Sequence, residues 1–429
     1  MADLDVVLFG PTGVTGREVA RHLARRAPTL GLRWGVAGRD RARIDQVLEV
    51  VGAEPDAVLI ADVEDADSID AMTGSATVIA NLVGPYARYG EPVYAACARN
   101  GTHELNLTGE TDWVKAMIDA YDDEATASGA KIVPTSGFEA LPFDLGALLA
   151  AQTLHERTGD AIVDVDVAVS MSSSKPMGAM TDAVSGGTFI SGVEAIQRGP
   201  GSDFTDPYLL DPPSSTARGR YDLRPRKHSA TRQWLAPMFP SPFLNPAVVH
   251  RTAALLRDSD DPLFAADFRY REGTVTEATV PKPAASATAA ALSVMSVGMG
   301  AAGRLPAEIR RPMAKWLLRV GPKAGTGPKP DDLDAWTYRL ERPGHRCAGR
   351  DPGRRGRSRR TSRLQVDRHH GRRGRLGPRR LDVRRPRRRR IPDTVHRSGA
   401  GLDRPDGRGR RPVHRRLSTV WSGRVSTVE

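Results

Sequence analysis

Short apolar runs alternate with amphipathic stretches along the first 134 residues of the chain. Residues 6–9 are apolar and β-branched, as expected of a buried strand, and apolar positions recur at helical spacing from residue 14 onward. Further elements are predicted as strands over 32–37, 57–61, 76–83, 103–107 and 131–134, and as helices over 91–99 and 112–127. Strands that alternate with helices at this spacing run parallel, with helices on both faces of the sheet. Residues 1–150 are therefore predicted to form a Rossmann-type, doubly wound α/β domain.

Three glycines lie between the first predicted strand and the first predicted helix. Glycines let the backbone turn sharply and approach a ligand closely, and the first amides of a helix carry a partial positive charge that suits a pyrophosphate. In this strand–turn–helix context the triplet predicts a dinucleotide site, and a purely structural turn is the alternative. The residues predicted to contact the dinucleotide in this turn are Gly10, Thr12, Gly13, Val14, Thr15 and Gly16.

The residues after the second predicted strand indicate which dinucleotide is bound. NAD-specific sites usually carry an acidic residue there for the ribose hydroxyls, but this chain has Gly38, Arg39 and Asp40. Arg39 is a planar, permanently charged donor that suits a 2′-phosphate, so NADP is favoured over NAD. Asp40 is either a ribose ligand or, in the interpretation we prefer, the cap of a helix that begins at Arg41.

Two further strand ends are predicted to contribute to the cofactor site. Asp62 follows the third strand and is a candidate contact on the adenine side. Asn81, Val83 and Gly84 lie at the end of the fourth strand, and ligands of open α/β sheets bind at the carboxyl ends of the strands. These three residues are therefore predicted to line the nicotinamide end.

Residues 151–341 are predicted to form a second, α+β domain. Residues 161–169 alternate with a period of two, which predicts a strand with one solvated face. Residues 189–197 suggest a helix, whereas residues 199–246, rich in Pro, Gly, Ser and charge, are expected to form a long surface excursion. The remaining predicted strands lie at 268–270 and 336–340.

The most apolar later stretch, residues 284–303, is rich in Ala, Ser, Met and Gly. It is long enough to span a membrane, but it contains three serines and a threonine and few large apolar residues. We expect a small-residue helix or loop that packs on the body of the protein. Peripheral contact with a membrane or an acyl chain is the first alternative, and a transmembrane span is the second.

Cysteine usage and short motifs limit the chemistry further. Only Cys97 and Cys347 occur, which argues against a disulfide framework and for a reducing, cytoplasmic location. The N-terminus enters a strand at once, and we expect no secretory signal. The sequence contains neither a His-Glu-x-x-His nor a Cys-x-x-Cys motif, so no metal site is predicted.

The basic character of the chain is confined to residues 342–429. Of the 63 lysines and arginines, 29 are arginines in this segment, which holds only seven acidic residues and no lysine. The segment therefore carries a charge of +22 and the rest of the chain −10, which together give the net +12. It shows neither helical nor strand periodicity and has too few apolar residues to offset its ordering entropy. We expect a disordered, low-complexity tail.

The arginine-rich tail allows two interpretations. One is an arm that binds nucleic acid. The other, which we prefer, is a change of reading frame near residues 340–350, because arginine without lysine is typical of a GC-rich gene read out of frame. A nucleic-acid partner is accordingly disfavoured. In that case the second domain lacks its last elements, and an unpaired sheet edge predicts poor stability or aggregation.

Several blocks of sequence, in this order, resemble the saccharopine dehydrogenase-like oxidoreductases, and most closely their mycobacterial branch of trans-acting enoyl reductases. The blocks are 10–16, 37–39, 81–86, 89–93, 97–103, 107–110, 136–146, 185–188 and, with altered spacing, 325–328. They span about residues 4–340. One departure is Asn106, where the family usually has an aspartate before the Leu-Thr-Gly-Glu block. This departure weakens any catalytic role for that position.

The resemblance implies NADPH-dependent reduction of a carbon–carbon double bond in an acyl chain carried by a polyketide synthase. The developing enolate then needs a hydrogen-bond donor and its α-carbon needs a proton. Tyr86 and Ser136, with the backbone around Gly84 and Gly137, are the best-placed candidates. Each of the eight tyrosines lacks a lysine four positions on, so the Tyr-x-x-x-Lys relay of short-chain dehydrogenases is not expected.

Three acidic residues are secondary acid–base candidates, and each is better explained as a helix cap: Glu110, Glu139 and Asp144. The alternative functions are a saccharopine-type dehydrogenase of amino-acid conjugates and a non-catalytic dinucleotide-binding or lipid-associated protein. The oligomeric state is not predicted.

Overall fold

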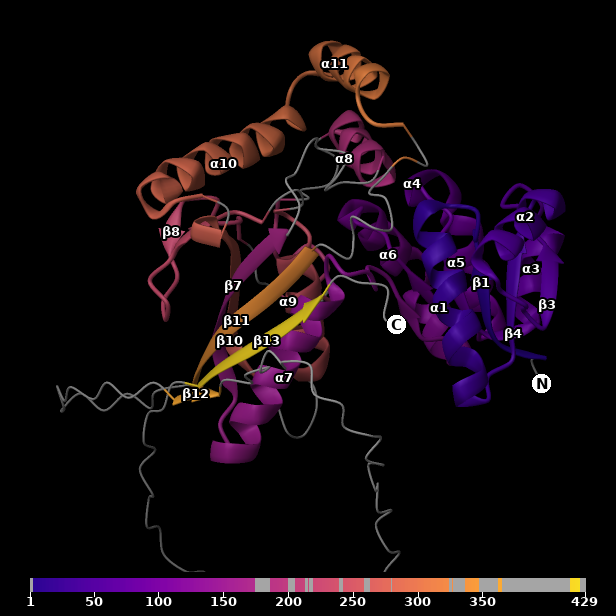
Figure 1. The fold of residues 1–429 in the computed structure, drawn as a ribbon, viewed down its shortest axis with the longest axis horizontal. Helices are drawn as coiled ribbons and strands as arrows, with labels where there is room; N and C mark the ends of the chain where they lie inside the picture. The colour runs from indigo at the N-terminus through magenta and orange to yellow at the C-terminus, as the bar shows by residue number, and fades with distance from the viewer. Residues whose placement is uncertain are drawn as a thin grey trace, which may run out of the picture.

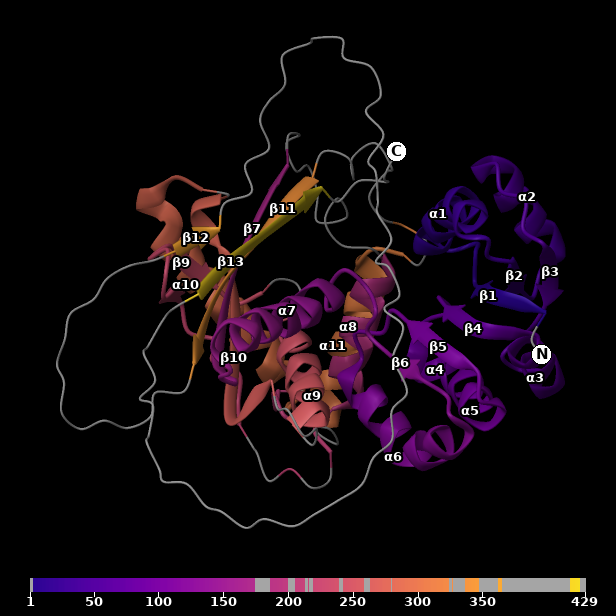
Figure 2. The same cartoon turned by 90° about the horizontal axis from the view of Figure 1, so that it is seen from below.

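The computed structural model describes residues 3–173, 186–199, 205–212, 215, 219–238, 242–257, 263–278, 280–323, 326, 336–346, 362–364 and 417–424. Two units are distinguished by their β-sheets (Figures 1 and 2). The N-terminal unit contains a six-stranded sheet, and the second unit contains a seven-stranded one.

The first sheet is entirely parallel and has the strand order β3-β2-β1-β4-β5-β6. Its strands are β1 (Leu4–Phe9), β2 (Trp34–Gly38), β3 (Ala57–Ile60), β4 (Ala76–Asn81), β5 (His103–Asn106) and β6 (Ile132–Val133). This is the order of a doubly wound Rossmann fold. The predicted fold class is confirmed, and each of the six predicted strands is present.

Helices cover both faces of this sheet. Successive side chains of β1 point to opposite faces and so enter two different cores. Leu8 packs in one core with Ala20 of the first helix and Ile44 of the second. Val7 and Phe9 point to the opposite core. The helices of the unit are α1 (Val14–Leu30), α2 (Arg41–Val51), α3 (Ala66–Gly74), α4 (Tyr86–Tyr89), α5 (Glu91–Asn100) and α6 (Thr111–Ser128).

The second sheet has the order β12-β13-β11-β7-β10-β9-β8 and mixes parallel with antiparallel pairs. Its strands are β7 (Ile162–Ser173), β8 (Arg226–Lys227), β9 (Trp234–Ala236), β10 (Phe264–Val275), β11 (Trp336–Arg346), β12 (Ser362–Leu364) and β13 (Leu417–Arg424). The other elements are α7 (Leu141–Thr158), α8 (Gly186–Arg198), α9 (Asn245–Arg257), the 3₁₀ turn Thr276–Ala278, α10 (Lys282–Ala302) and α11 (Ala307–Val320). Helices α7 and α9 pack on the central strands. The second unit therefore begins with α7, before residue 150.

Two expectations for the second domain are wrong. The polar face of β7 is not solvated: Asp166 is 1 % exposed, and its carboxylate pairs with Arg226 at 2.7 Å. Residues 199–246 are not purely a surface excursion, because they supply β8, β9 and the buried side chains of Leu210 and Leu235. In both cases a partner distant in sequence buries polar segments that local composition marks as exposed.

The tail also differs from expectation where the structure describes it. Residues 417–424 form β13, which pairs antiparallel with β11 over eight residues, and β12 pairs parallel with β13. The edge of β11 predicted to be unpaired is thus occupied. The reading-frame change near residues 340–350 falls largely outside the described residues and stays a prediction.

Of the small-residue helix or loop expected over residues 284–303, the structure shows a helix, α10. Ala285 and Ala289 are completely buried on its inner face, and the Thr276 hydroxyl donates to the carbonyl of Ala285. Its segment Pro283–Ala302 is, among the described residues, the one helix long and apolar enough to cross a membrane, with a mean hydropathy of 1.4. Only 28 % of that window is buried, so most of the helix is not packed on the body.

Candidate functional site

Two of the three glycines hold the turn between β1 and α1 in shape. Gly10 has a φ of +92°, a left-handed conformation that other residues rarely adopt, and an added Cβ would lie 2.9 Å from Cγ2 of Val83. An added Cβ on Gly16 would lie 2.2 Å from the carbonyl oxygen of Gly10. Both positions therefore need glycine for the fold of the turn itself.

Gly13 is a glycine for which the protein alone gives no reason. It precedes α1 with φ −70° and ψ 167°, and an added Cβ would meet no atom closer than 3.8 Å. Gly13, Thr12 and Thr15 are exposed, and no side chain caps α1. The first amides of a helix lack partners within it, and the glycine at this place in a dinucleotide fingerprint lets a pyrophosphate approach the backbone. The turn, including the amides of Val14 and Thr15, fits that group.

The end of β2 separates the roles of two neighbouring side chains. Oδ1 of Asp40 accepts a hydrogen bond from the Arg43 amide at 3.1 Å, and Oδ2 lies 3.2 Å from Nε of the same residue. Asp40 therefore caps α2, and the preferred interpretation of this residue is confirmed. Arg39 is exposed and forms no ion pair with any described residue. Its guanidinium is available to a phosphate.

The ends of β3 and β4 place four predicted cofactor residues at the same sheet edge. Oδ1 of Asp62 accepts from the amide of Glu64 at 3.1 Å and shapes the turn after β3. Asn81 is completely buried, and its Oδ1 accepts from the amide of Val83 at 3.1 Å. Asn81 therefore supports from below the turn that presents Val83 and the exposed Gly84.

The Tyr86 side chain is buried beneath this turn. Its hydroxyl donates to the carbonyl oxygen of Asn81 at 2.9 Å and accepts from the amide of Leu107 at 3.1 Å. The ring packs against Trp113, with 5.8 Å between ring centroids. Burial raises the pKa of Tyr86 well above its ordinary range. The arrangement favours a structural role over that of proton donor.

Ser136 follows β6 and lies at the same edge of the sheet. Its amide donates to the carbonyl oxygen of Asn106 at 2.7 Å, and its hydroxyl donates to that of Val133 at 2.8 Å. The structure thus brings both predicted catalytic residues to the carboxyl ends of the strands. In each, the hydroxyl hydrogen is bonded to a backbone carbonyl.

A buried carboxyl lies among the strands beneath these turns. Oε1 of Glu104 accepts from Asn81 at 3.0 Å and from Asn106 at 3.2 Å, while Oε2 has no hydrogen-bond partner. Burial raises the pKa of Glu104 to about 7, against the opposing effect of these two hydrogen bonds. Asn106 donates to this carboxyl, which an aspartate could do only if it held a proton.

Glu110 joins the two units. Its Oε1 accepts from the amide of Tyr86 at 3.0 Å and from the Ser191 hydroxyl at 3.1 Å. Its Oε2 accepts from the amide of Ala87 at 3.2 Å and from Nη1 of Arg198 at 3.3 Å. Glu110 therefore binds the N-terminus of α4. The sequence suggested that its side chain caps α6, but it makes no capping hydrogen bond to that helix.

Helix α8 is the element through which the second unit reaches this site. In addition to its bond to Glu110, Arg198 donates two hydrogen bonds to the carboxylate of Asp112, at 2.7 and 2.9 Å. Arg88 on α4 pairs with Glu194 on α8 at 2.6 Å. Sequence reasoning predicted the helix but not these contacts. The available signal was three polar residues at spacings of three and four along α8: Ser191, Glu194 and Arg198.

Two sequence blocks that are far apart meet at the start of α8. The amide of Gly186 donates to the carbonyl of Thr326 at 2.8 Å, and an added Cβ on Gly186 would lie 1.8 Å from the Lys323 carbonyl oxygen. Ser185, Gly325, Gly327 and Pro328 of these blocks lie outside the described residues. The close approach gives a packing reason for glycine at position 186.

The remaining acidic candidates do not cap α7. Asp144 lies in its first turn and accepts from the hydroxyl of Thr252 on α9 at 3.0 Å, and burial raises its pKa to about 6. Glu139 lies exposed in the preceding loop. Across the described ranges, histidine, cysteine and acidic side chains nowhere gather into a group that could hold a metal ion.

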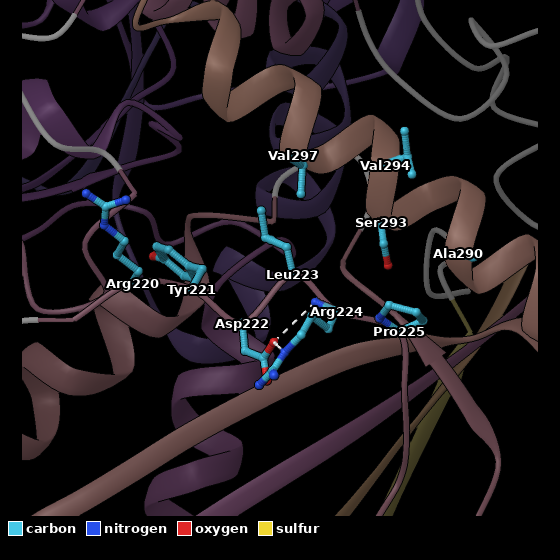
Figure 3. Close-up of a pocket in the computed structure, with 10 residues that line it drawn as sticks. All are labelled: Arg220, Tyr221, Asp222, Leu223, Arg224, Pro225, Ala290, Ser293, Val294 and Val297. Carbon is cyan, nitrogen blue, oxygen red and sulfur yellow. Dashed lines mark hydrogen bonds and ion pairs between the residues drawn. The ribbon is translucent and has the colours of Figure 1, made fainter.

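A groove of about 700 Å³ lies away from the glycine turn, between α10 and residues 220–225 (Figure 3). Leu223 and Val297 face each other across it, and Arg224 pairs with Asp222 at its rim. Helix α10, which lines the groove, lies far from β1 in Figure 1. The groove is not part of the candidate cofactor site.

The parallel sheet order and the glycine turn at its centre define a Rossmann-type fold joined to a second sheet domain. No protein-family model matches the chain. A trans-acting enoyl reductase of Mycobacterium leprae is 33 % identical over 346 residues, covering 76 % of this chain and 77 % of that protein. A putative trans-acting enoyl reductase of Mycobacterium tuberculosis is 31 % identical over 353 residues, covering 79 % and 80 %. The chain belongs to the trans-acting enoyl reductase family of oxidoreductases.

Among solved structures, apo saccharopine dehydrogenase (L-Glu forming) from Saccharomyces cerevisiae aligns with 80 % of this chain and 81 % of its own. The sequence identity is 12 % and the TM-score 0.41, so this alignment carries no functional argument.

Proposed function

We propose that this chain is a cytoplasmic, NADPH-dependent enoyl reductase that acts on an acyl chain carried by a polyketide synthase. The observation that supports it most directly is Gly13: the protein has room for a side chain there, yet the position is glycine at the exposed start of α1. A bound pyrophosphate accounts for this choice. The activity named for the curated relatives supplies the reaction type.

In this proposal the carboxyl edge of the first sheet holds the cofactor. The amides at the start of α1 bind the pyrophosphate, and the free guanidinium of Arg39 binds the 2′-phosphate. Asp62 lies on the adenine side. Val83 and Gly84 line the nicotinamide end, and Asn81 fixes the turn that carries them.

Bound NADPH would supply the hydride that reduces the double bond. The protein's contribution is to orient the acyl thioester and to stabilise negative charge on its oxygen. Gly84 lies exposed on the turn after β4, where its backbone amide can donate to that oxygen. Ser136 lies on the turn after β6 at the same sheet edge, with its own amide and hydroxyl bonded to the carbonyls of Asn106 and Val133. Tyr86 acts beneath these turns, because its hydroxyl ties the end of β4 to the segment after β5.

Calorimetric titration of the full chain with NADPH and NADH tests the cofactor assignment. Arg39→Ala should weaken NADPH binding by about 1.5–3 kcal/mol, as for a lost charged hydrogen bond, and leave NADH binding nearly unchanged. Arg43→Ala is the matched control, since Arg43 is exposed and pairs with Asp40. Equal losses for both nucleotides would remove Arg39 from the site.

The reaction is tested by following NADPH absorbance with an α,β-unsaturated acyl thioester. Substrate-dependent oxidation of NADPH supports the reductase assignment. Tight NADPH binding without oxidation by thioesters of any chain length would instead favour a non-catalytic dinucleotide-binding protein.

A further inference from the structure

Helices α10 and α11 lie together along the upper edge of the second unit in Figure 1, on the side away from α7. Between Pro283 and Ala302, α10 carries no charged residue, although 27 % of the whole chain is charged. Only 28 % of this window is buried. Exposed apolar surface of this extent marks an interaction site in soluble proteins.

The outward face of α10 carries apolar side chains. Val294 is 73 % exposed and points away from the loop beneath the helix in Figure 3, and Met295 beside it is 39 % exposed, whereas Val297 faces Leu223 across the groove. The buried serines Ser293 and Ser296 donate to carbonyls within α10 itself, at 2.8 and 2.9 Å. Their hydroxyls are therefore satisfied within the helix, and they add no unpaired polar group to this surface.

Helix α11 presents a second apolar stripe. Ile309, Trp316 and Val320 are 55 %, 61 % and 58 % exposed, and their spacing of seven and four residues places them on one helical face. The inner face of α11 contacts the body of the protein through Arg310, which is buried and donates to the carbonyl oxygens of Gln197 and Leu305. The exposed stripe is thus fixed in orientation by the body of the protein.

A row of cations borders this apolar stripe. Arg311, Lys315 and Arg319 repeat at every fourth position, all exposed, on the face adjacent to Trp316. Glu308 is the one acidic residue of α11. An apolar face with tryptophan beside a cationic face is typical of helices that lie in the interface of a bilayer.

We propose that α10 and α11 form a docking surface for a lipid bilayer with anionic headgroups. Val294, Ile309, Trp316 and Val320 enter the acyl boundary, and the cations of α11 meet the headgroup phosphates. The charge row distinguishes this occupant from a second copy of the chain, because an isologous contact brings each copy's row of cations toward the other's. The proposal does not depend on the redox activity.

Flotation of the full chain with phosphatidylcholine vesicles, with and without phosphatidylglycerol, measures the docking. Val294→Asp should lower the partition coefficient about tenfold, because a side chain that enters the apolar part of the bilayer becomes charged. Val50→Asp on α2 is the matched control: this valine is 72 % exposed, and its replacement should leave the partition unchanged. Equal losses for the two variants would overturn the proposal.

The charged row is tested with Lys315→Glu combined with Arg319→Glu. Binding to vesicles that contain phosphatidylglycerol should fall at least about tenfold. Arg25→Glu combined with Arg26→Glu on α1 changes the net charge equally and controls for attraction by net charge alone. If the control pair weakens binding as much, net charge and not the cation row of α11 governs binding to the vesicles, and the proposal fails.

Trp316 provides a readout of depth that is independent of affinity. Brominated acyl chains should quench the part of the fluorescence that wild-type protein has and Trp316→Phe lacks. Absence of quenching in vesicle-bound protein contradicts the proposal. So does a change of molecular mass by light scattering in Val294→Asp with unchanged vesicle binding, because that result assigns the surface to self-association.

Discussion

At the scale of single residues, two glutamates after and within β5 are held in opposite ways. Glu110 receives four hydrogen bonds, from two backbone amides, a serine and an arginine. Glu104 is completely buried and receives two, both on one oxygen. Four donors therefore surround the Glu110 carboxylate, whereas burial with one unpaired oxygen disfavours the charge of Glu104.

Glu104→Gln should stabilise the protein at alkaline but not at acidic pH. The folded pKa of Glu104, about 7, lies above its ordinary value of 4.5. Its contribution to stability is therefore fully present below about pH 4.5 and is lost as the pH rises through about 7. At about pH 8 the amide should gain on the order of 2–3 kcal/mol in the free energy of unfolding.

Thermal denaturation across this pH range measures the effect. Glu49→Gln, at an exposed position of α2, should show no pH-dependent difference from wild type. A stabilisation by Glu104→Gln that is the same at both ends of the range would mean that Glu104 titrates normally.

The three glycines of the first turn should separate stability from binding. The Cβ added by Gly13→Ala meets no atom closer than 3.8 Å, so this variant should cost less than about 1 kcal/mol of stability, while NADPH affinity falls at least about tenfold. Gly16→Ala forces its Cβ against the Gly10 carbonyl and should cost about 1–3 kcal/mol of stability. Melting temperature and calorimetric titration of the two variants check this. Unchanged NADPH affinity in a folded Gly13→Ala variant would contradict the assigned pyrophosphate site.

At the scale of elements, α8 is the link between the two sheets. Arg198→Ala removes the paired hydrogen bonds to Asp112 and one bond to Glu110, and should lower stability by about 1–3 kcal/mol. It should also speed proteolysis between the units, since α8 no longer ties them together. Arg224→Ala removes a surface pair within one loop and should leave the melting temperature unchanged. Identical behaviour of the two variants would remove α8 as the link.

The elements that sequence pattern predicted are those whose burial is decided locally. In the first unit, apolar runs such as residues 6–9 and 76–83 are buried on both faces by helices adjacent in sequence. In the second unit, β8 and β9 were missed because their burial depends on β10, about forty residues on. The glycine turn and the Asp40 cap followed from local spacing, whereas the bonds of Tyr86 and Glu110 join residues more than twenty positions apart.

At the scale of the whole molecule, the described hydrophobic cores and the excess of basic residues lie in different parts of the chain. Among the described residues, the compact cores are built from side chains up to Leu340, and the basic excess of the sequence lies after residue 341. Strand β13 nevertheless places part of the tail on the edge of β11. The frame change remains a prediction that resequencing of the gene tests: an intact frame, shared by close relatives with the same tail, would refute it.

The four bonds of Glu110 have a thermodynamic consequence for turnover. The same carboxylate holds the turn after β4 and the helix that carries the second sheet domain. Separation of the two units and loosening of the turn after β4 are therefore coupled. Any ligand that moves α8 away from Glu110 must also disturb this turn, and any ligand that orders the turn favours the state in which the two units stay joined.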